Sequence, residues 1–191
     1  RMDATTKCSF NCQYCFSNMR RGNRGYTSES FNSSLFEKRL QRPGAKGIIG
    51  EWLLHKMPIH FGGMSDPFCS VESTQCSKNM IDISSTYLYP IVISTKNPEA
   101  LLNIDSLKSD LHVIQVSFSV YDQALSKALE PNAPSPQARI NAIRKITDYG
   151  FKVIARIQPF IPQFRNDVMY DLVPRLLDSK VDHIILEHLK I

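Results

Sequence analysis

Short apolar runs rich in β-branched residues alternate along this chain with longer stretches of helical periodicity. The strand-like runs cover residues 59–61, 91–93, 113–118, 151–157 and 183–186. They begin roughly 20 to 40 residues apart, which is the spacing of strand–helix–strand units with right-handed crossovers. Nearly continuous apolar runs are typical of parallel strands covered by helices. The alternation therefore predicts an α/β fold with a parallel sheet, either open or closed into a barrel.

Helical stretches are expected at 28–40, 48–57, 71–84, 98–108, 135–149 and 166–179. The clearest is 135–149, where Ser135 can cap the helix, Pro136 suits its first turn and Gly150 can follow its end. Pro174 interrupts the last stretch, so that helix must kink or restart there. Ligands of open parallel sheets and of barrels bind at the C-terminal ends of the strands. The loops expected to carry chemistry are therefore 7–16, 62–69, 94–97, 117–122 and 158–165.

Three of the five cysteines stand close together, as Cys8, Cys12 and Cys15, with the spacing C-x3-C-x2-C. Five cysteines cannot all pair into internal disulfides, and neighbours this close would form strained ones. Three converging thiolates leave one iron of a 4Fe–4S cluster open to an external ligand, whereas zinc would need a fourth residue such as a histidine. The triplet therefore indicates a thiolate metal site, for iron and sulfur or for zinc.

The cysteine loop, with Tyr14 directly before its last cysteine, resembles the signature loop of the radical S-adenosylmethionine (SAM) superfamily. The resemblance implies that Cys8, Cys12 and Cys15 hold three irons of a 4Fe–4S cluster, that SAM chelates the fourth, and that Tyr14 packs near the adenine. It implies reductive cleavage of SAM to methionine and a 5′-deoxyadenosyl radical, which abstracts hydrogen from a substrate. An external electron donor of the flavodoxin or ferredoxin type is implied as well.

Five further segments resemble, in order, the spore photoproduct lyase-like (DNA repair photolyase-like) branch of that superfamily: 61–67, 94–96, 116–119, 129–139 and 157–162. By this resemblance, Gly62 and Gly63 approach the amino-acid part of SAM, which residues without a Cβ permit. Lys96 would reach SAM, and Ser117 would hydrogen-bond to it. Arg156 would either point toward the cofactor or form a surface ion pair.

The chain also departs from that branch. Photoproduct lyases carry a hydrogen-donating cysteine where this chain has Gly63 or its neighbours, and the nearest thiol, Cys69, lies several residues downstream. Specific lesion repair is therefore not expected. Cys69 and Cys76 are open to two interpretations, as auxiliary cluster ligands or radical partners, or as structural thiols. Glu130 and Arg139 are expected to pair with each other and to fix the loop before the helix that begins near residue 135.

The formal net charge is +5, and residues 20–46 account for all of it, with seven Lys/Arg against two glutamates. This basic segment is either a solvated face or a site for nucleic acid or another polyanion. Its basic residues are Arg20, Arg21, Arg24, Lys38, Arg39, Arg42 and Lys46. The composition, 42% apolar and 21% charged, is typical of a globular protein. No window reaches the about 18 apolar residues of a membrane span.

The predicted fold is a partial (β/α)6 barrel of parallel strands, with residues 1–191 forming one radical SAM core domain that is part of a longer chain. We expect a cytoplasmic radical SAM enzyme of the lyase or oxidoreductase type, with no membrane partner. The substrate is unknown, and nucleic acid is a candidate. The alternative is a non-catalytic protein in which the three cysteines and a histidine hold zinc and the basic segment binds nucleic acid.

Overall fold

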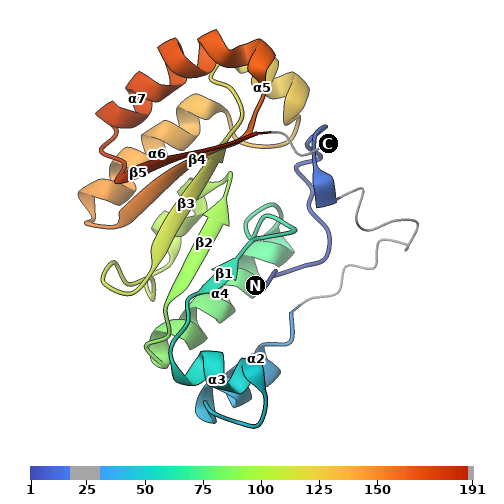
Figure 1. The fold of residues 1–191 in the computed structure, drawn as a ribbon, viewed down its shortest axis with the longest axis vertical. Helices are drawn as coiled ribbons and strands as arrows, with labels where there is room; N and C mark the ends of the chain where they lie inside the picture. Colours follow the sequence, from blue (N-terminus) through green and yellow to red (C-terminus); the bar gives the residue numbers. More distant parts are fainter. Residues whose placement is uncertain (18–30, 189–191) are drawn as a thin grey trace.

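The structure is a computed structural model that describes residues 1–17 and 31–188. Five parallel strands form one sheet in sequence order: β1 (Ile59–Phe61), β2 (Ile91–Thr95), β3 (Val113–Phe118), β4 (Lys152–Phe160) and β5 (His183–His188). A parallel bridge from Met2 to Phe61 places the N-terminal segment beside β1, at the next position of the sheet. The predicted α/β fold with parallel strands is confirmed, and the curved sheet with its helices forms a partial barrel (Figure 1).

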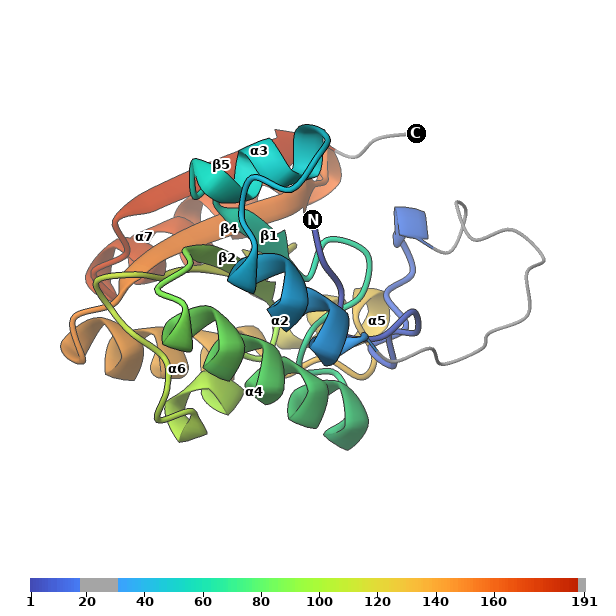
Figure 2. The same ribbon diagram turned by 90° about the horizontal axis from the view of Figure 1, so that it is seen from below.

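Helical elements precede β1 and connect the successive strands, and α4 and α6 lie on the same side of the sheet (Figure 2). They are α2 (Ser33–Gln41), α3 (Ile48–Leu54), α4 (Val71–Thr86), the 3-10 turn η1 (Pro98–Asn103), α5 (Gln123–Leu129), α6 (Pro136–Asp148), the 3-10 turn η2 (Pro162–Phe164), the π-helical turn η3 (Asp167–Leu172) and α7 (Val173–Asp178). None of the helices in the described residues is long and apolar enough to cross a membrane.

Helix α6 forms where its end signals predict it. The Ser135 hydroxyl accepts a hydrogen bond from the Ala138 backbone N–H at 3.2 Å, and Pro136 occupies the first turn. Gly150 follows the helix with φ of +82°, a left-handed conformation that glycine adopts without strain. These end signals fix where α6 begins and ends.

The hydrophobic core lies between α6 and the outer face of the sheet. Ile140, Ile143 and Ile146 recur at helical spacing and are buried against β3 and β4. On the two strands, every second residue is fully buried on this face, as the alternation of side chains along a strand requires. These residues are Ile114, Val116, Phe118, Val153, Ala155 and Ile157.

The helices depart from the expectation at two places. Of the stretch 98–108, only the 3-10 turn η1 is helical, and α5 forms where we expected no helix. The last stretch restarts at its proline, as expected, because α7 begins at Val173 with Pro174 in its first turn. In the basic segment, Lys38 and Arg39 lie on α2, whereas Arg20, Arg21 and Arg24 are outside the described residues.

The inner face of the sheet is lined by polar side chains. His60 of β1 hydrogen-bonds the Ser94 hydroxyl of β2 at 2.7 Å, and that hydroxyl donates to Gln115 Oε1 of β3 at 2.8 Å. Arg156 of β4 and Glu187 of β5 form an ion pair at 2.6 Å further along the sheet. Parallel sheets covered on both faces carry apolar side chains on both. The polar lining therefore marks the inner face as the side where a polar ligand can lie.

Candidate functional site

The cysteine loop lies at the C-terminal ends of the strands. Because the N-terminal segment runs parallel to β1, the residues that follow it emerge at the edge where β1 ends at Phe61. The loop is tied to the end of α5 and to the segment after it by two backbone hydrogen bonds, from Gln13 N to Leu129 O at 2.9 Å and from Asn132 N to Phe10 O at 3.3 Å. The loop therefore occupies the edge at which ligands of parallel sheets bind.

Glu130 is the centre of a buried charged network. Only 1% of its surface is exposed, and its carboxylate pairs with Arg139, which is equally buried. Lys96 Nζ lies 3.8 Å from the same carboxylate. The hydroxyl groups of Tyr14 and Ser119 both donate to it, the latter at 3.0 Å. The network thus joins the cysteine loop, the ends of β2 and β3, and α6.

Pairing within the network holds its members in defined charge states. Burial raises the pKa of Glu130, but the positive charges of Lys96 and Arg139 lower it by more. The resulting pKa of Glu130 is about 2. Burial lowers the pKa of Lys96, whereas Tyr14 and Glu130 raise it above its ordinary value. Burial raises the pKa of Tyr14, so its hydroxyl keeps the proton that it donates. Lys96 is therefore a fixed cation at the end of β2, 5.6 Å from the centre of the Tyr14 ring.

The three cysteines of the loop are free thiols. Cys12 is buried and the other two are half-buried; the Cys15 backbone N–H donates to Cys12 O at 3.2 Å. Cys69 lies beside the start of the loop, because its thiol reaches the Lys7 carbonyl oxygen at 3.8 Å and its carbonyl accepts a hydrogen bond from the Ser9 hydroxyl. In residues 1–17 and 31–188, no three His, Cys, Asp or Glu side chains converge. Thiolates suit both iron–sulfur clusters and zinc, so the donor set fits either group, and the assignment of Cys8, Cys12 and Cys15 as ligands stays a prediction.

A tight turn follows β1 at Gly62, where φ is +87°. A Cβ atom there would lie 2.3 Å from the Ser94 carbonyl oxygen and 2.8 Å from Pro67 Cδ, so only glycine fits. At Gly63, a Cβ atom would meet only the flexible side chain of Arg1, at 2.2 Å. The structure therefore requires glycine at the first position of the Gly-Gly pair for its backbone geometry.

Asp66 fixes the loop after β1 to the end of β2. Its carboxylate accepts hydrogen bonds from the Thr95 hydroxyl at 2.9 Å, from Lys96 N at 2.6 Å and from Phe68 N at 2.9 Å. Burial raises the pKa of Asp66 to about 6, although these hydrogen bonds favour the ionised form. Asp66 thereby positions the backbone of Lys96, a role that the sequence motif around it did not reveal.

Ser117 and Arg156 lie on paired positions of β3 and β4, facing the inner side of the sheet. The Ser117 carbonyl accepts a hydrogen bond from Arg139 Nη1 at 2.8 Å. Arg156 forms its ion pair with Glu187, and Gln158 donates to the same carboxylate at 2.9 Å. The structure therefore places Tyr14 and Lys96 together, and it places Arg156 in a separate cluster with Glu187.

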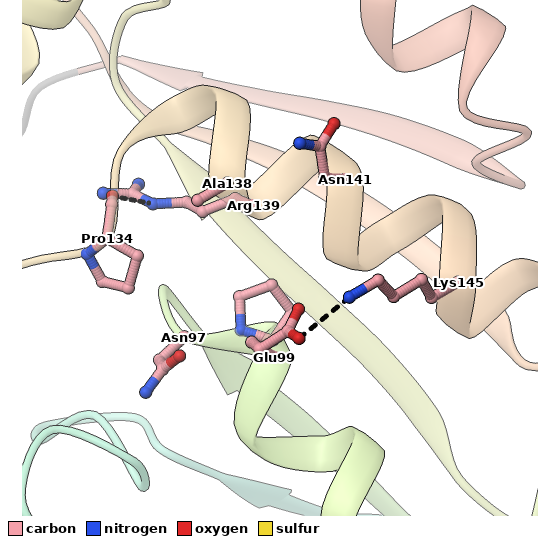
Figure 3. A pocket seen from close by; sticks show the side chains of 8 residues that line it. Asn97, Glu99, Pro134, Ala138, Arg139, Asn141 and Lys145 are labelled. Atoms are coloured by element: carbon pink, nitrogen blue, oxygen red, sulfur yellow. Dashed lines mark hydrogen bonds and ion pairs between the residues drawn. The ribbon is translucent and has the colours of Figure 1, made fainter.

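A surface pocket of about 230 Å³ lies between η1 and α6 (Figure 3). Lys145 and Glu99 form an ion pair at 3.0 Å across it. Arg139 also lines the pocket, but its Nε donates to the Pro134 carbonyl at 2.9 Å. This pocket contains none of the cysteines or glycines predicted to bind the cofactors.

Comparison with solved structures identifies the fold. SuiB from Streptococcus suis, solved with S-adenosylmethionine bound, aligns over 98% of this chain and 40% of its own, with a TM-score of 0.69 and 15% identity. Spore photoproduct lyase complexed with dinucleoside spore photoproduct aligns over 97% of this chain and 55% of its own, with a TM-score of 0.73 and 18% identity. The chain has the radical SAM fold.

Sequence comparison adds one uncharacterised relative and no family. The protein ORF301 of Acidianus two-tailed virus is 31% identical in an alignment of 105 residues that covers 51% of this chain and 35% of the relative. No family model matches the chain. The chain thus spans 35% of this relative and 40% and 55% of the two structures with the radical SAM fold.

Proposed function

We propose that the chain is the cofactor-binding core of a radical SAM enzyme, in which a 4Fe–4S cluster is held by Cys8, Cys12 and Cys15. The observation that carries this proposal is the buried contact of Tyr14 with Glu130 beside Lys96. It joins the cysteine loop to the strand ends, in a fold that the chain shares with SuiB, a protein solved with S-adenosylmethionine bound.

A 4Fe–4S cluster with three thiolate ligands supplies an open iron position and the electron for reductive cleavage of SAM. Lys96 offers a fixed cation to the carboxylate of SAM, and Tyr14 offers its ring to the adenine. The turn at Gly62, which packs against the end of β2, lies at the strand end where we place the amino-acid part of SAM. Ser117, on the inner face of β3, is placed to hydrogen-bond the cofactor from the side of the sheet. We infer that the electron comes from a flavodoxin- or ferredoxin-type donor.

The substrate, on this proposal, lies against the polar inner face of the sheet. His60, Gln115 and Arg156 present imidazole, amide and guanidinium groups there. The solved relatives carry different ligands, since one spore photoproduct lyase structure holds a dinucleoside spore photoproduct and one SuiB structure holds the precursor peptide SuiA. Nucleic acid stays a proposal that rests on the basic segment.

Replacing Cys8, Cys12 or Cys15 by alanine will abolish the iron–sulfur absorbance of the anaerobically reconstituted chain, because each change removes one of three thiolates. Cys76→Ala is the matched control and will retain it, since the Cys76 thiol donates to the Ala4 carbonyl at 3.3 Å. Iron and acid-labile sulfide per chain are measured together with the absorbance.

Two results would overturn the ligand assignment. One is a cluster retained in full by Cys12→Ala, and the other is a cluster lost by Cys76→Ala. A colourless protein that holds one zinc per chain and takes up no iron would support the zinc-binding alternative instead.

A further inference from the structure

Helix α3 carries an apolar face that points away from the protein. A surface helix normally buries its apolar face and exposes its polar one. On α3, Gly50 and Leu53 are the buried residues. The opposite side carries Ile48 and Trp52, one helical turn apart, with Ile49 beside them, and more than half of each residue is exposed. The fold does not use these three side chains, so the exposed apolar face needs an explanation of its own.

The α2–α3 hairpin (residues 33–57) holds this face in a fixed position through a small core of its own. Leu53 of α3 belongs to one buried cluster with Phe36 of α2 and with Tyr89. The Tyr89 hydroxyl donates to the Met57 carbonyl at 2.7 Å. The core thus fixes the backbone of α3 without the side chains of its outward face.

Basic side chains flank α3 on both sides along the chain. The α2–α3 hairpin holds five lysines and arginines against two glutamates. All five are exposed, and none forms an ion pair with an acidic side chain within residues 1–17 and 31–188. They are Lys38, Arg39, Arg42, Lys46 and Lys56. The hairpin therefore complements a surface that is both anionic and apolar.

The hairpin also lies where a flat surface can reach it. Helices α2 and α3 occupy one end of the long axis of the molecule (Figure 1), and in the view from that end α3 lies in front of the strands (Figure 2). Helix α3 leads into β1 at Ile59, so it lies at the N-terminal ends of the strands, opposite the edge with the cysteine loop. A surface that contacts α3 therefore leaves the edge with the cysteine loop open.

We propose that the α2–α3 hairpin binds the surface of an anionic lipid bilayer. Ile48, Ile49 and Trp52 enter the interface, and the five cations contact the lipid phosphates. Aliphatic side chains and a tryptophan, next to lysines and arginines, are the composition of segments that lie in the bilayer interface.

A bilayer suits this surface because it recognises apolar and basic side chains without shape complementarity. The pocket between η1 and α6 and the cavity beside Cys69 both lack residues of the hairpin, so neither offers it a groove for a protein partner. The sequence expectation of no membrane partner rested on the lack of a membrane span, which interfacial binding does not require.

Trp52 is the only tryptophan of the chain, so its fluorescence reports on the apolar face directly. The whole chain is mixed with vesicles of phosphatidylcholine, or of phosphatidylcholine with phosphatidylglycerol, in low and in high salt. We expect the anionic vesicles to shift the Trp52 emission to shorter wavelength, and lipids brominated in their acyl chains to quench it. High salt will weaken the binding, because it screens the contacts between cations and phosphates.

Two double variants separate the apolar contribution from the charged one. Ile48→Ser with Ile49→Ser will abolish the emission shift, because the polar residues do not enter the interface. Arg42→Gln with Lys46→Gln will weaken binding to the anionic vesicles roughly 30-fold, since each cation near an anionic bilayer contributes about fivefold to the affinity. Val71→Ser is the control, because Val71 is an apolar residue of α4 that is 89% exposed, and it will leave binding unaltered. Circular dichroism checks that each variant is folded.

Anionic vesicles that bind the chain without changing the Trp52 emission would overturn the proposal, and so would full binding by the Ile48→Ser, Ile49→Ser variant. An emission shift that needs protein concentration but no lipid, with a dimer in sedimentation, would assign the face to a second copy of the chain instead. Duplex DNA binding that needs Arg42 and Lys46, without vesicle binding, would assign the cations to nucleic acid. The vesicle experiment involves neither the cluster nor SAM, so its result is independent of the proposed function.

Discussion

Replacing Arg139 by methionine will lower the free energy of unfolding by about 3–5 kcal/mol, because it leaves the Glu130 carboxylate buried without its main partner. Arg139 and Glu130 are each only 1% exposed. The change also removes the donors to the carbonyls of Ser117 and Pro134. Chemical denaturation followed by circular dichroism measures the difference.

Lys145→Met is the matched control, since it removes another cation from the same helix. Lys145 pairs with Glu99, and 56% of each side chain is exposed. An exposed pair of this kind contributes about 1 kcal/mol or less. A loss for Arg139→Met no larger than the loss for Lys145→Met would show that the Glu130 network does not hold the site together.

The same network determines how the free energy of unfolding changes with pH under acidic conditions. The pKa of Glu130 is lowered from 4.5 to about 2 in the folded chain. A carboxylate with a lowered folded pKa contributes stability that is complete above its unfolded pKa and is lost as the pH falls through its folded pKa. The stability contributed by Glu130 therefore falls between pH 4.5 and about pH 2, and Glu130→Gln will flatten the profile in that range.

Gly62→Ala will destabilise the chain by roughly 2–5 kcal/mol, because the added Cβ meets both left-handed backbone strain and a clash. The Cβ atom would lie 2.3 Å from the Ser94 carbonyl oxygen, which β2 holds in place. Gly150→Ala separates the two causes. Gly150 also has a positive φ, +82°, but a Cβ atom there meets nothing within 4 Å.

The Gly150 variant should therefore show the strain alone, about 1–2 kcal/mol. Both variants are compared with the unaltered chain by the same denaturation experiment. Equal losses in Gly62→Ala and Gly150→Ala would contradict the close approach of the turn to β2. A larger loss of stability in Gly62→Ala than in Gly150→Ala supports this close approach. The turn at Gly62 is where we place the amino-acid part of SAM.

Periodicity predicted the strands and α6 because local signals determine both. Alternating burial is visible in β3 and β4, and the capping residue Ser135 marks the start of α6. Helix α5 was missed because it has only seven residues. Its signal was Asp122, whose side chain accepts a hydrogen bond from Leu125 N at 2.8 Å and so caps the helix.

The contacts of the site depend on tertiary structure and could be predicted only in part. The pairing of Glu130 with Arg139 was expected, since the two residues flank one loop and carry opposite charges. The contact of Glu130 with Tyr14 spans 116 residues of sequence, and no local pattern encodes it. The contact of Cys69 with the start of the cysteine loop was missed for the same reason.

The most direct test of the account is whether the reconstituted, reduced chain cleaves SAM. The chain is loaded with iron and sulfide without oxygen, reduced with dithionite and incubated with SAM, and 5′-deoxyadenosine is measured by liquid chromatography. We predict 5′-deoxyadenosine from the unaltered chain and none from the Cys12→Ala variant. A chain that holds a full 4Fe–4S cluster and forms no 5′-deoxyadenosine, or forms equal amounts with and without Cys12, would contradict the central claim.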